Sequence, residues 1–365
     1  MKPFLSTHSD PEIQIPKKYH NTNDLCAVIY DQLTEIFKED NYKELFKSSI
    51  PLEDATNKLK ELEENGVHLL DWLKENDQNS AIETVLTKHI TTAVTNDFLN
   101  FVFESLYTAK RGKMAVAYSL IRKPFSDLLF ILEQVYVDKT DFIERFFHNG
   151  EPSEYDPSNN KLDKLAVIQK AISKMSTPSF FNSQHIYDMR YNKEASYGLK
   201  GITNHAVHVV TNDKNYKTKN QNLNFIFSNE EDLDRYFEHY YSTVPFLLIY
   251  AVGIIDGIIF EILVDSDNQK LKIVKEFRRL VANIILTEFT SLRTKKSNQE
   301  LFNAIADKLK IRCEECGEIN SIERADCELF LETEILLCCK CTNNILSTDH
   351  AIEAIEKIIE SLKHS

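Results

Sequence analysis

Glycine and proline are scarce in this chain, which has 8 glycines and 9 prolines among 365 residues. β-Sandwiches and β-barrels need many tight turns, so this scarcity favours a fold built from long helices. The glycine spacing of a phosphate-binding loop or a dinucleotide fingerprint is missing, and neither H-E-x-x-H nor G-x-S-x-G occurs. These absences exclude the commonest nucleotide-binding, zinc-protease and serine-hydrolase sites.

Positive charge is also in deficit. Lysine and arginine total 43 against 56 aspartates and glutamates, and the net charge is −13. Because affinity for nucleic acid comes mainly from cationic side chains, the composition does not support global attraction to DNA or RNA; a local basic patch stays open. The charge and the 42% content of hydrophobic residues fit a soluble cytoplasmic protein with a packed core.

Cysteine is nearly absent from the first three hundred residues, where Cys26 stands alone, whereas six cysteines lie between positions 313 and 341. A secreted disulfide framework would spread paired cysteines through the chain. The first twenty residues also lack the apolar run of a signal peptide. We therefore expect a reducing, cytoplasmic setting in which the clustered cysteines bind metal.

Apolar residues recur at helical spacing along most of the chain, which predicts a mainly α fold, a bundle of many helices. Asn23 or Asp24 is expected to cap the first helix, and Pro51 to open the second. Pro124 is expected to kink a helix or to mark a junction. The predicted helices span about residues 25–37, 51–73, 80–108, 113–137, 140–148, 161–175, 230–243, 245–264 and 267–291.

Three segments follow from this pattern. Residues 1–22 are expected to form a flexible arm, residues 23–296 the helical body, and residues 297–365 a cysteine-containing module with flanking helices. A loop at 150–160 is the best internal boundary within the body. Residues 176–230 are the least regular part, and short extended segments such as 222–227 are expected there.

The segment 245–264 is long and apolar enough to span a membrane. Asp256 lies near its centre, however, where a charge costs about 3 kcal/mol on an insertion scale. We therefore predict the central helix of a soluble bundle, apolar on all sides, and no membrane partner. A buried carboxylate needs a partner, for which Arg278 and Arg279 are the candidates.

Two C-x-x-C pairs carry the strongest signal: Cys313 with Cys316, and Cys338 with Cys341. Together they supply four thiolates, the tetrahedral set that Zn²⁺ prefers. Gly317 follows the first pair and lets the backbone turn beneath it, whereas the second pair has no such glycine. The pattern resembles the zinc-ribbon family over about 35 residues. The resemblance implies a small hairpin sheet around one zinc ion.

Two further cysteines lie close to these pairs. Cys339 is an alternative to Cys338 as ligand, although the C-x-C spacing that it would form is less common. Cys327 is expected to pack in the hairpin, because residues 327–337 are rich in β-compatible types. A site closed by four protein ligands has no position for a reacting water, so we predict structural rather than catalytic Zn²⁺.

Helices are predicted on both sides of the ribbon. Ser297 and Glu300 have capping-box spacing at the start of one helix, and Thr348 or Asp349 opens the other. The terminal helix carries an apolar stripe formed by Ile352, Ile355, Ile358, Ile359 and Leu362. This stripe must be buried against the ribbon, the body or a second copy of the chain, so the module is expected to be docked.

Polar residues gather at two places in the body. Arg122 lies in an apolar helix, and Arg190, His205 and His208 lie within the segment 187–211. The two histidines are three residues apart, so one helix face can present both to a substrate or ion. Local hydrogen bonding at a helix edge, an anion or RNA site, and a second metal site are the three interpretations.

An arginine in an apolar helix followed by an Arg…Asn-His segment resembles the HEPN-like helical domains of bacterial defence and toxin proteins, over residues 100–240. Catalytic members have a longer spacing between an arginine and a histidine on one helix, which forms a ribonuclease site. Here Arg235 and His239 are separated by three residues, and Arg145 and His148 by two. The resemblance therefore implies a non-catalytic or divergent member.

These features predict a cytoplasmic helical scaffold or regulatory protein of bacterial defence or stress response, rather than an enzyme. The expected partner is another protein or a second copy of the chain. The alternative is a divergent, metal-independent ribonuclease in which Arg122, Arg190, His205 and His208 converge. Nucleic-acid binding by the ribbon is a weaker alternative, because acidic residues outnumber basic ones between 313 and 341.

Overall fold

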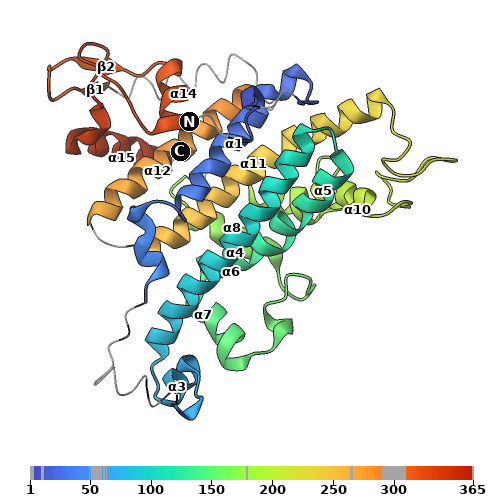
Figure 1. Ribbon diagram of the computed structural model, residues 1–365, viewed down its shortest axis with the longest axis horizontal. Helices are drawn as coiled ribbons and strands as arrows, with labels where there is room; N and C mark the ends of the chain where they lie inside the picture. Colours follow the sequence, from blue (N-terminus) through green and yellow to red (C-terminus); the bar gives the residue numbers. More distant parts are fainter. Residues whose placement is uncertain are drawn as a thin grey trace.

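The protein is mainly α-helical, as its sequence predicts (Figure 1). The computed structural model describes residues 4–9, 12–48, 50, 60, 62, 64–177, 180–263, 266–289 and 310–363. Within these ranges, β-structure is confined to one two-stranded sheet and an isolated bridge in the C-terminal module. The fold class, a mainly α protein with a C-terminal cysteine cluster, is confirmed.

The body is built from helices of very different lengths. They are α1 (His20–Glu35), α3 (Leu69–Glu75), α4 (Asn79–Lys110), α5 (Met114–Lys123), α6 (Leu129–Val137), α7 (Lys139–Ile143), α8 (Lys164–Lys174), α9 (Ser183–Tyr191), α10 (Leu199–Val207), α11 (Glu230–Ile262) and α12 (Ser266–Phe289). The C-terminal module contains β1 (Lys310–Arg312), β2 (Ile319–Ser321), α14 (Arg324–Thr333) and α15 (Asp349–Lys363). The helices predicted to open at Pro51 and at Ser297 begin outside the described residues.

Helix α11 forms the core of the body. It crosses the molecule in Figure 1 and packs against α1, α4, α6 and α12. Leu247, Leu248 and Tyr250 in its middle are 0% exposed. In the described part of the chain, α11 is the one helix long and apolar enough to cross a membrane, and 89% of its most apolar window is buried inside the protein. Such burial is the environment of a core helix.

Proline acts differently in two of the helices. The sequence predicts separate helices on either side of Pro245, but α11 continues through it. That prediction is wrong because proline removes a single backbone donor, at a cost of about 3 kcal/mol, while the apolar residues around it are buried. Pro124 does mark a junction: α5 ends before it, and a turn of π-helix, η4 (Pro124–Leu128), leads into α6.

The N-terminal residues lie against α1. Asn23 and Asp24 do not cap this helix, which begins at His20; that prediction is wrong. They bind the preceding arm instead, because Asn23 Nδ2 donates to the carbonyl of Leu5 at 3.0 Å and Asp24 accepts from the Thr7 N–H at 2.6 Å. The hydrogen bonds hold Leu5 in a site where it is only 2% exposed.

The region between α8 and α11 contains helix as well as loops. Helices α9 and α10 lie within residues 176–230, and loops follow from His208 to α11. The extended segment predicted at 222–227 is instead a turn, because Phe225 adopts a left-handed φ of +58°. These loops fold back on themselves: the N–H of Asn224 donates to the carbonyl of Val209 at 2.9 Å.

The C-terminal module differs from the predicted ribbon in one element. Residues predicted to form strands, 327–337, lie largely in helix α14. A capping box between Glu323 and Asp326 starts this helix, and buried Cys327, Phe330 and Leu331 follow at helical spacing. Packing on one face therefore overrides β-propensity. The hairpin is formed by β1 and β2, which are antiparallel and flank the first cysteine pair.

The module docks onto the body through α12. Figure 1 shows α14 and α15 beside this helix, and the Phe330 ring lies 4.9 Å from that of Phe277. The stripe of the terminal helix is buried within the chain, against α12 and β1: Ile355, Ile358 and Ile359 are at most 4% exposed. A second copy is therefore not needed to cover it.

Four charged side chains complete the docking. Glu334, just after α14, lies 2.7 Å from Lys275 Nζ and 2.6 Å from Arg278 Nη1. Glu35 of α1 lies 2.5 Å and 3.0 Å from the same two groups. Arg278 Nε also donates to the carbonyl of Leu331 at 2.7 Å. Burial alone would raise the pKa of the Glu334 carboxyl, but the nearby cations Lys275 and Arg278 lower this pKa overall.

Replacing Glu334 by glutamine leaves these two cations with a single carboxylate. We expect E334Q to lower the free energy of unfolding by about 3 kcal/mol at neutral pH, because a buried charge loses its partner. The folded pKa of Glu334 lies below its ordinary 4.5, so its stabilisation is present above that pH and is lost as pH falls further. Urea unfolding at neutral pH and near pH 3 measures both effects.

The exposed neighbour Glu332 supplies the matched control, E332Q. An equal loss of stability in E332Q would contradict this account. So would a difference in the free energy of unfolding between wild type and E334Q that is larger near pH 3 than at neutral pH.

Candidate metal centre

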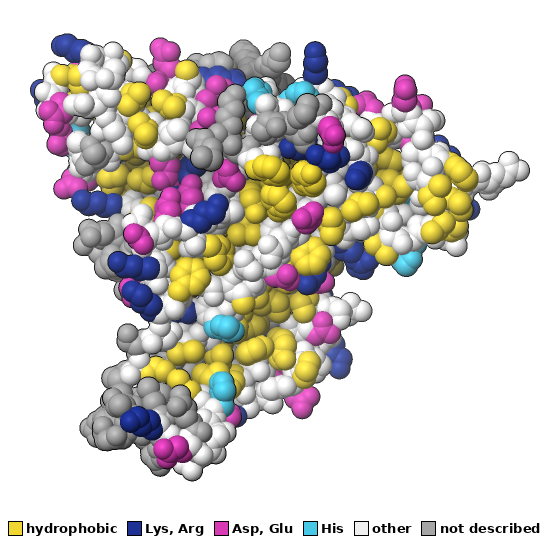
Figure 2. Space-filling model, in the orientation of Figure 1, with side chains coloured by type: hydrophobic (Ala, Val, Ile, Leu, Met, Phe, Trp, Pro, Cys, Tyr) yellow, Lys and Arg dark blue, Asp and Glu magenta, His cyan; other side chains and the backbone are white. Residues whose placement is uncertain are grey.

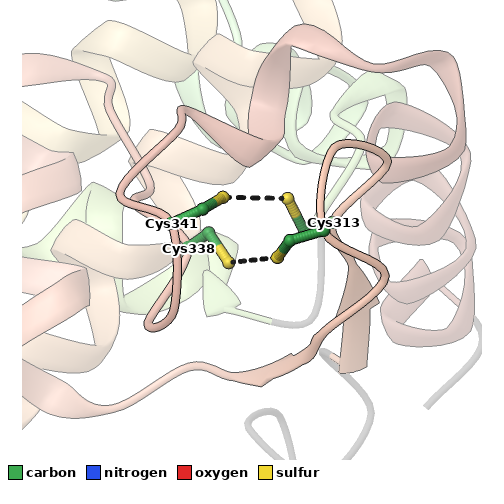
Figure 3. A group of neighbouring side chains, drawn as sticks. Cys313, Cys338 and Cys341 are labelled. Carbon is green, nitrogen blue, oxygen red and sulfur yellow. Dashed lines mark hydrogen bonds between the residues drawn. The ribbon is translucent and has the colours of Figure 1, made fainter.

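Four sulfur atoms meet in the C-terminal module. Cys313 and Cys316 lie in the turn between β1 and β2, and Cys338 and Cys341 lie in the segment after α14. The Sγ atoms all lie within 4.8 Å of one another, with 3.6 Å between Cys313 and Cys341 and between Cys316 and Cys338. Figure 3 shows the labelled cysteines pointing their sulfur atoms across the gap between the two segments. The predicted cluster is confirmed.

These separations suit a metal ion rather than disulfide bonds. A disulfide is about 2.05 Å long, and the cysteines of the described residues form no disulfide bond. Four thiolates at about 2.3 Å from one Zn²⁺ place their sulfur atoms about 3.8 Å apart. The cluster could therefore hold an ion such as zinc, with every tetrahedral position filled by the protein.

The two cysteine turns share one backbone geometry. The N–H of Gly317 donates to the carbonyl of Cys313, and the N–H of Thr342 donates to the carbonyl of Cys338, each at 2.9 Å. Gly317 and Thr342 both have left-handed φ values, of +74° and +59°. Glycine adopts this conformation freely, whereas threonine is strained there. The second turn thus forms without the glycine that the sequence lacks at this position.

Cys338, and not Cys339, completes the cluster. Cys338 is 1% exposed, and the backbone N–H groups of Cys341 and Lys340 lower the pKa of its thiol to about 6, which favours the metal-binding thiolate. Cys339 is exposed, and its N–H donates to Oδ1 of Asn320 at 2.8 Å. Buried Asn320 also donates to a carbonyl of β1, so it joins the two cysteine turns.

Arg190, a candidate catalytic residue, belongs to a buried ion pair. Its guanidinium lies 2.5 Å from Glu133 Oε1, and both side chains are 0% exposed. Arg190 Nε donates to the carbonyl of Phe125 at 2.7 Å, and the Tyr250 hydroxyl donates to Glu133 at 2.6 Å. Burial raises the pKa of Tyr250, so the hydroxyl stays a neutral donor. The fully enclosed pair has no access to a substrate and holds α6, α9 and α11 together.

The other three candidates lie in different environments. Arg122 is partly exposed near the end of α5. His205 is half-buried on α10, with Nδ1 3.0 Å from the carbonyl of Tyr216, and burial lowers the pKa of His205. His208 is exposed and follows the end of α10, so helical spacing does not align the two histidines. Because Arg190 is enclosed, the four residues do not share one open site.

The Arg235–His239 pair is likewise engaged in local contacts. Arg235 forms an ion pair with Asp232, and His239 Nδ1 lies 3.0 Å from the Tyr118 hydroxyl. Burial lowers the pKa of His239 to about 4, so the imidazole is neutral at physiological pH and is not a ready proton donor.

Several residues that build the site carry no sequence signal of their own. Asn320 lies in a short strand, and Glu334, Lys275 and Glu35 belong to segments rich in charge. A pattern search finds the cysteines because their spacing is local. Residues that contact each other only in the folded chain, such as Glu35 and Lys275, have no characteristic spacing in the sequence.

Comparisons with family models, with curated proteins and with solved structures gave no match. The geometry of this chain therefore carries the functional argument.

We expect the purified protein to contain one zinc ion per chain. Cys338→Ser should lose the metal, because three thiolates and a hydroxyl bind Zn²⁺ far more weakly than four thiolates. Cys339→Ser should keep it, because that side chain lies outside the cluster. Metal analysis after dialysis against a weak chelator tests the assignment. Zinc loss from C339S together with retention by C338S would reverse it.

Substitutions at Gly317 and Thr342, in the two cysteine turns, are expected to have opposite effects on stability. Gly317→Ala should lower the free energy of unfolding by about 1 kcal/mol, whereas Thr342→Gly should raise it by about 0.5 kcal/mol, through relief of left-handed strain. A Cβ at Gly317 would meet Arg312 at an ordinary 3.6 Å, so backbone conformation dominates its effect. Thermal unfolding of the zinc-loaded variants measures both changes, and effects of the same sign would refute the shared geometry.

Proposed function

We propose that this protein is a cytoplasmic helical scaffold with a zinc-stabilised C-terminal module, and that it binds a protein partner through the loops after α10. The observation that carries the proposal is an exposed apolar patch. Its members are between 48% and 62% exposed: Val207, Val209, Val210, Ile226 and Phe227. Figure 2 shows hydrophobic side chains gathered at the right-hand end of the molecule, where the loops after α10 lie in Figure 1. Contiguous apolar surface of this kind marks interaction sites.

Charge around the patch indicates the chemistry of the partner. Lys214, Lys217 and Lys219 are exposed on the loop between the two halves of the patch. Attraction between opposite charges steers association and selects partners. Lys214 lies 3.9 Å from Glu194 and Lys219 lies 3.8 Å from Asp232, so Lys217 is the lysine that we propose for contact with an acidic residue of the partner. The proposed partner is a protein with an apolar contact face.

The rest of the chain supports a scaffold rather than an enzyme. The cysteine cluster has no open ligand position, and Arg190 is enclosed in an ion pair. The terminal helix is used internally. We propose a role in bacterial defence or stress response from the resemblance of residues 100–240 to HEPN-like domains, as a non-catalytic member.

Proximity labelling in the source cells, followed by calorimetry with each purified candidate, tests this proposal. We expect at least one candidate whose Kd rises at least tenfold with the Val210→Ser, Phe227→Ser double variant, since each buried apolar side chain contributes about 1.5–3 kcal/mol. Leu329→Ser, at an exposed apolar residue on α14, is the matched control and should bind normally. Absence of any direct binder, or equal affinity for both variants, would overturn the proposal.

A divergent ribonuclease is the second candidate, favoured by one cavity. A space of about 70 Å³ is lined by His205, Lys217 and Lys219, which combine a titratable ring with cationic groups suited to phosphate. We expect no cleavage if the scaffold proposal holds. Incubation of a mixed RNA pool with wild type and with the His205→Ala, His208→Ala variant decides the matter, because cleavage lost in the variant would establish the nuclease.

A further inference from the structure

Three cations lie at the ends of neighbouring helices in the body. Arg122 is in the last turn of α5, Lys164 is the first residue of α8, and Lys200 is the second residue of α10. Helix α10 packs against α5 and α9, and α9 packs against α8. We refer to the three residues as the cation cluster. Each of them is partly exposed, so a ligand can reach it from solvent.

Asp127 is the carboxylate common to the three cations. Lys164 Nζ lies 5.6 Å from the centre of the Tyr191 ring, and the Tyr191 hydroxyl donates to the carbonyl of Ser126 at 2.9 Å, one residue before Asp127. Arg122, Lys200 and Lys164 are all within electrostatic range of the Asp127 carboxylate. The cluster therefore surrounds a single half-turn of chain after α5.

The cation cluster lacks close partners of opposite charge. In the described part of the chain, the side chains of Arg122 and Lys200 form no ion pair or hydrogen bond, and the Asp127 carboxylate forms no ion pair. Lys164 Nζ donates to the carbonyl of Asn159 at 3.1 Å, which carries no net charge. The positive charges of the cluster are therefore poorly compensated by the protein itself.

This arrangement costs stability. Burial lowers the pKa of the Lys200 ammonium, and repulsion from Arg122 lowers this pKa further. Burial and repulsion from Lys200 lower the pKa of Lys164 in the same way. Both lysines also lie in the first turn of a helix, where the partial positive charge of the helix end disfavours a cation. Cations held together at such a cost, in a chain of net charge −13, indicate a binding role.

The charge and the surroundings of the cluster define the ligand. Besides Asp127, the carboxylate near Lys164 is Asp156, which already accepts from the N–H and the hydroxyl of Ser158 at 2.7 Å each. A phosphate group carries about 1.5–2 negative charges near neutral pH and accepts several hydrogen bonds from arginine and lysine. Lys164 also lines an open groove of about 430 Å³ beside Tyr187, which has room for the rest of a small molecule. A long polyanion would be repelled by the acidic protein as a whole.

We propose that the cation cluster binds the phosphate group of a small phosphorylated molecule, whose remainder occupies the groove beside Tyr187. The Arg122 guanidinium and the ammonium groups of Lys164 and Lys200 donate to the phosphate oxygens, and the bound phosphate offsets the repulsion between the three cations. The cluster lies at the opposite end of α10 from the apolar patch, and this site is independent of the scaffold proposal.

Calorimetric titration of the full-length, zinc-loaded protein at low ionic strength tests the proposal, with inorganic phosphate, glycerol 3-phosphate and acetate as probes. We expect at least one phosphate compound to bind with a Kd of about 1 mM or tighter, and acetate to bind about tenfold more weakly. Arg122→Gln and Lys200→Gln should each weaken phosphate binding about tenfold, because each removes a charged hydrogen-bond donor. Asp127→Asn should strengthen it severalfold, because a carboxylate that repels the anion is lost.

Lys123→Gln is the matched control, because Lys123 is the next residue after Arg122 but is exposed and lies 2.8 Å from Asp97; this variant should bind like wild type. Thermal unfolding without ligand adds a second readout: Lys200→Gln should be at least as stable as wild type, since it relieves repulsion.

Absence of heat with both phosphate compounds would overturn the proposal, and so would equal affinity for acetate. An equal loss of binding in Lys123→Gln, or unchanged binding in Arg122→Gln and Lys200→Gln, would also overturn it. Binding of an RNA oligomer that depends on Arg122, without binding of either phosphate compound, would replace it by a nucleic-acid site.

Discussion

The C-terminal module depends on four sulfur atoms held within 4.8 Å of one another. The two segments that carry them are also joined by a hydrogen bond from the Cys339 N–H to Asn320 Oδ1 and by an ion pair between Lys340 and Glu318. So small a unit buries too little apolar surface to be stable alone, and a structural metal is the usual remedy. In both turns a backbone N–H donates to the carbonyl of the first cysteine of the pair, so the two turns present their cysteines in the same way.

Helix α12 connects the C-terminal module to the body. Lys275 and Arg278 face Glu35 and Glu334, while the next residue, Arg279, faces Asp256 of α11. One helix thus carries the docking charges on one side and the partner of the buried Asp256 on another. Because each cation is buried, its removal would leave carboxylates without partners, so this helix has little freedom to shift. Helix α12 therefore connects the core helix α11 with the C-terminal module.

The sequence predicts the parts of this structure that depend on local spacing. Helical periodicity identifies α4, α6, α12 and α15, and the C-x-x-C spacing identifies the cluster. Prediction fails where tertiary packing decides, as in α14, whose β-compatible residues form a helix because Phe330 packs against Phe277. It fails also at Pro245, where burial outweighs a lost hydrogen bond. The sequence names Arg278 and Arg279 as candidate partners of Asp256 but does not distinguish between them. Adjacent residues on a helix face different neighbours, and in the structure Arg279 lies beside Asp256 while Arg278 lies beside Glu334.

Zinc K-edge absorption spectroscopy of the purified protein tests the central claim most directly, because it reports the ligand atoms themselves. The account predicts a single shell of four sulfur atoms at about 2.3 Å from the metal. A shell containing nitrogen or oxygen ligands, or a protein that binds no zinc, would contradict it.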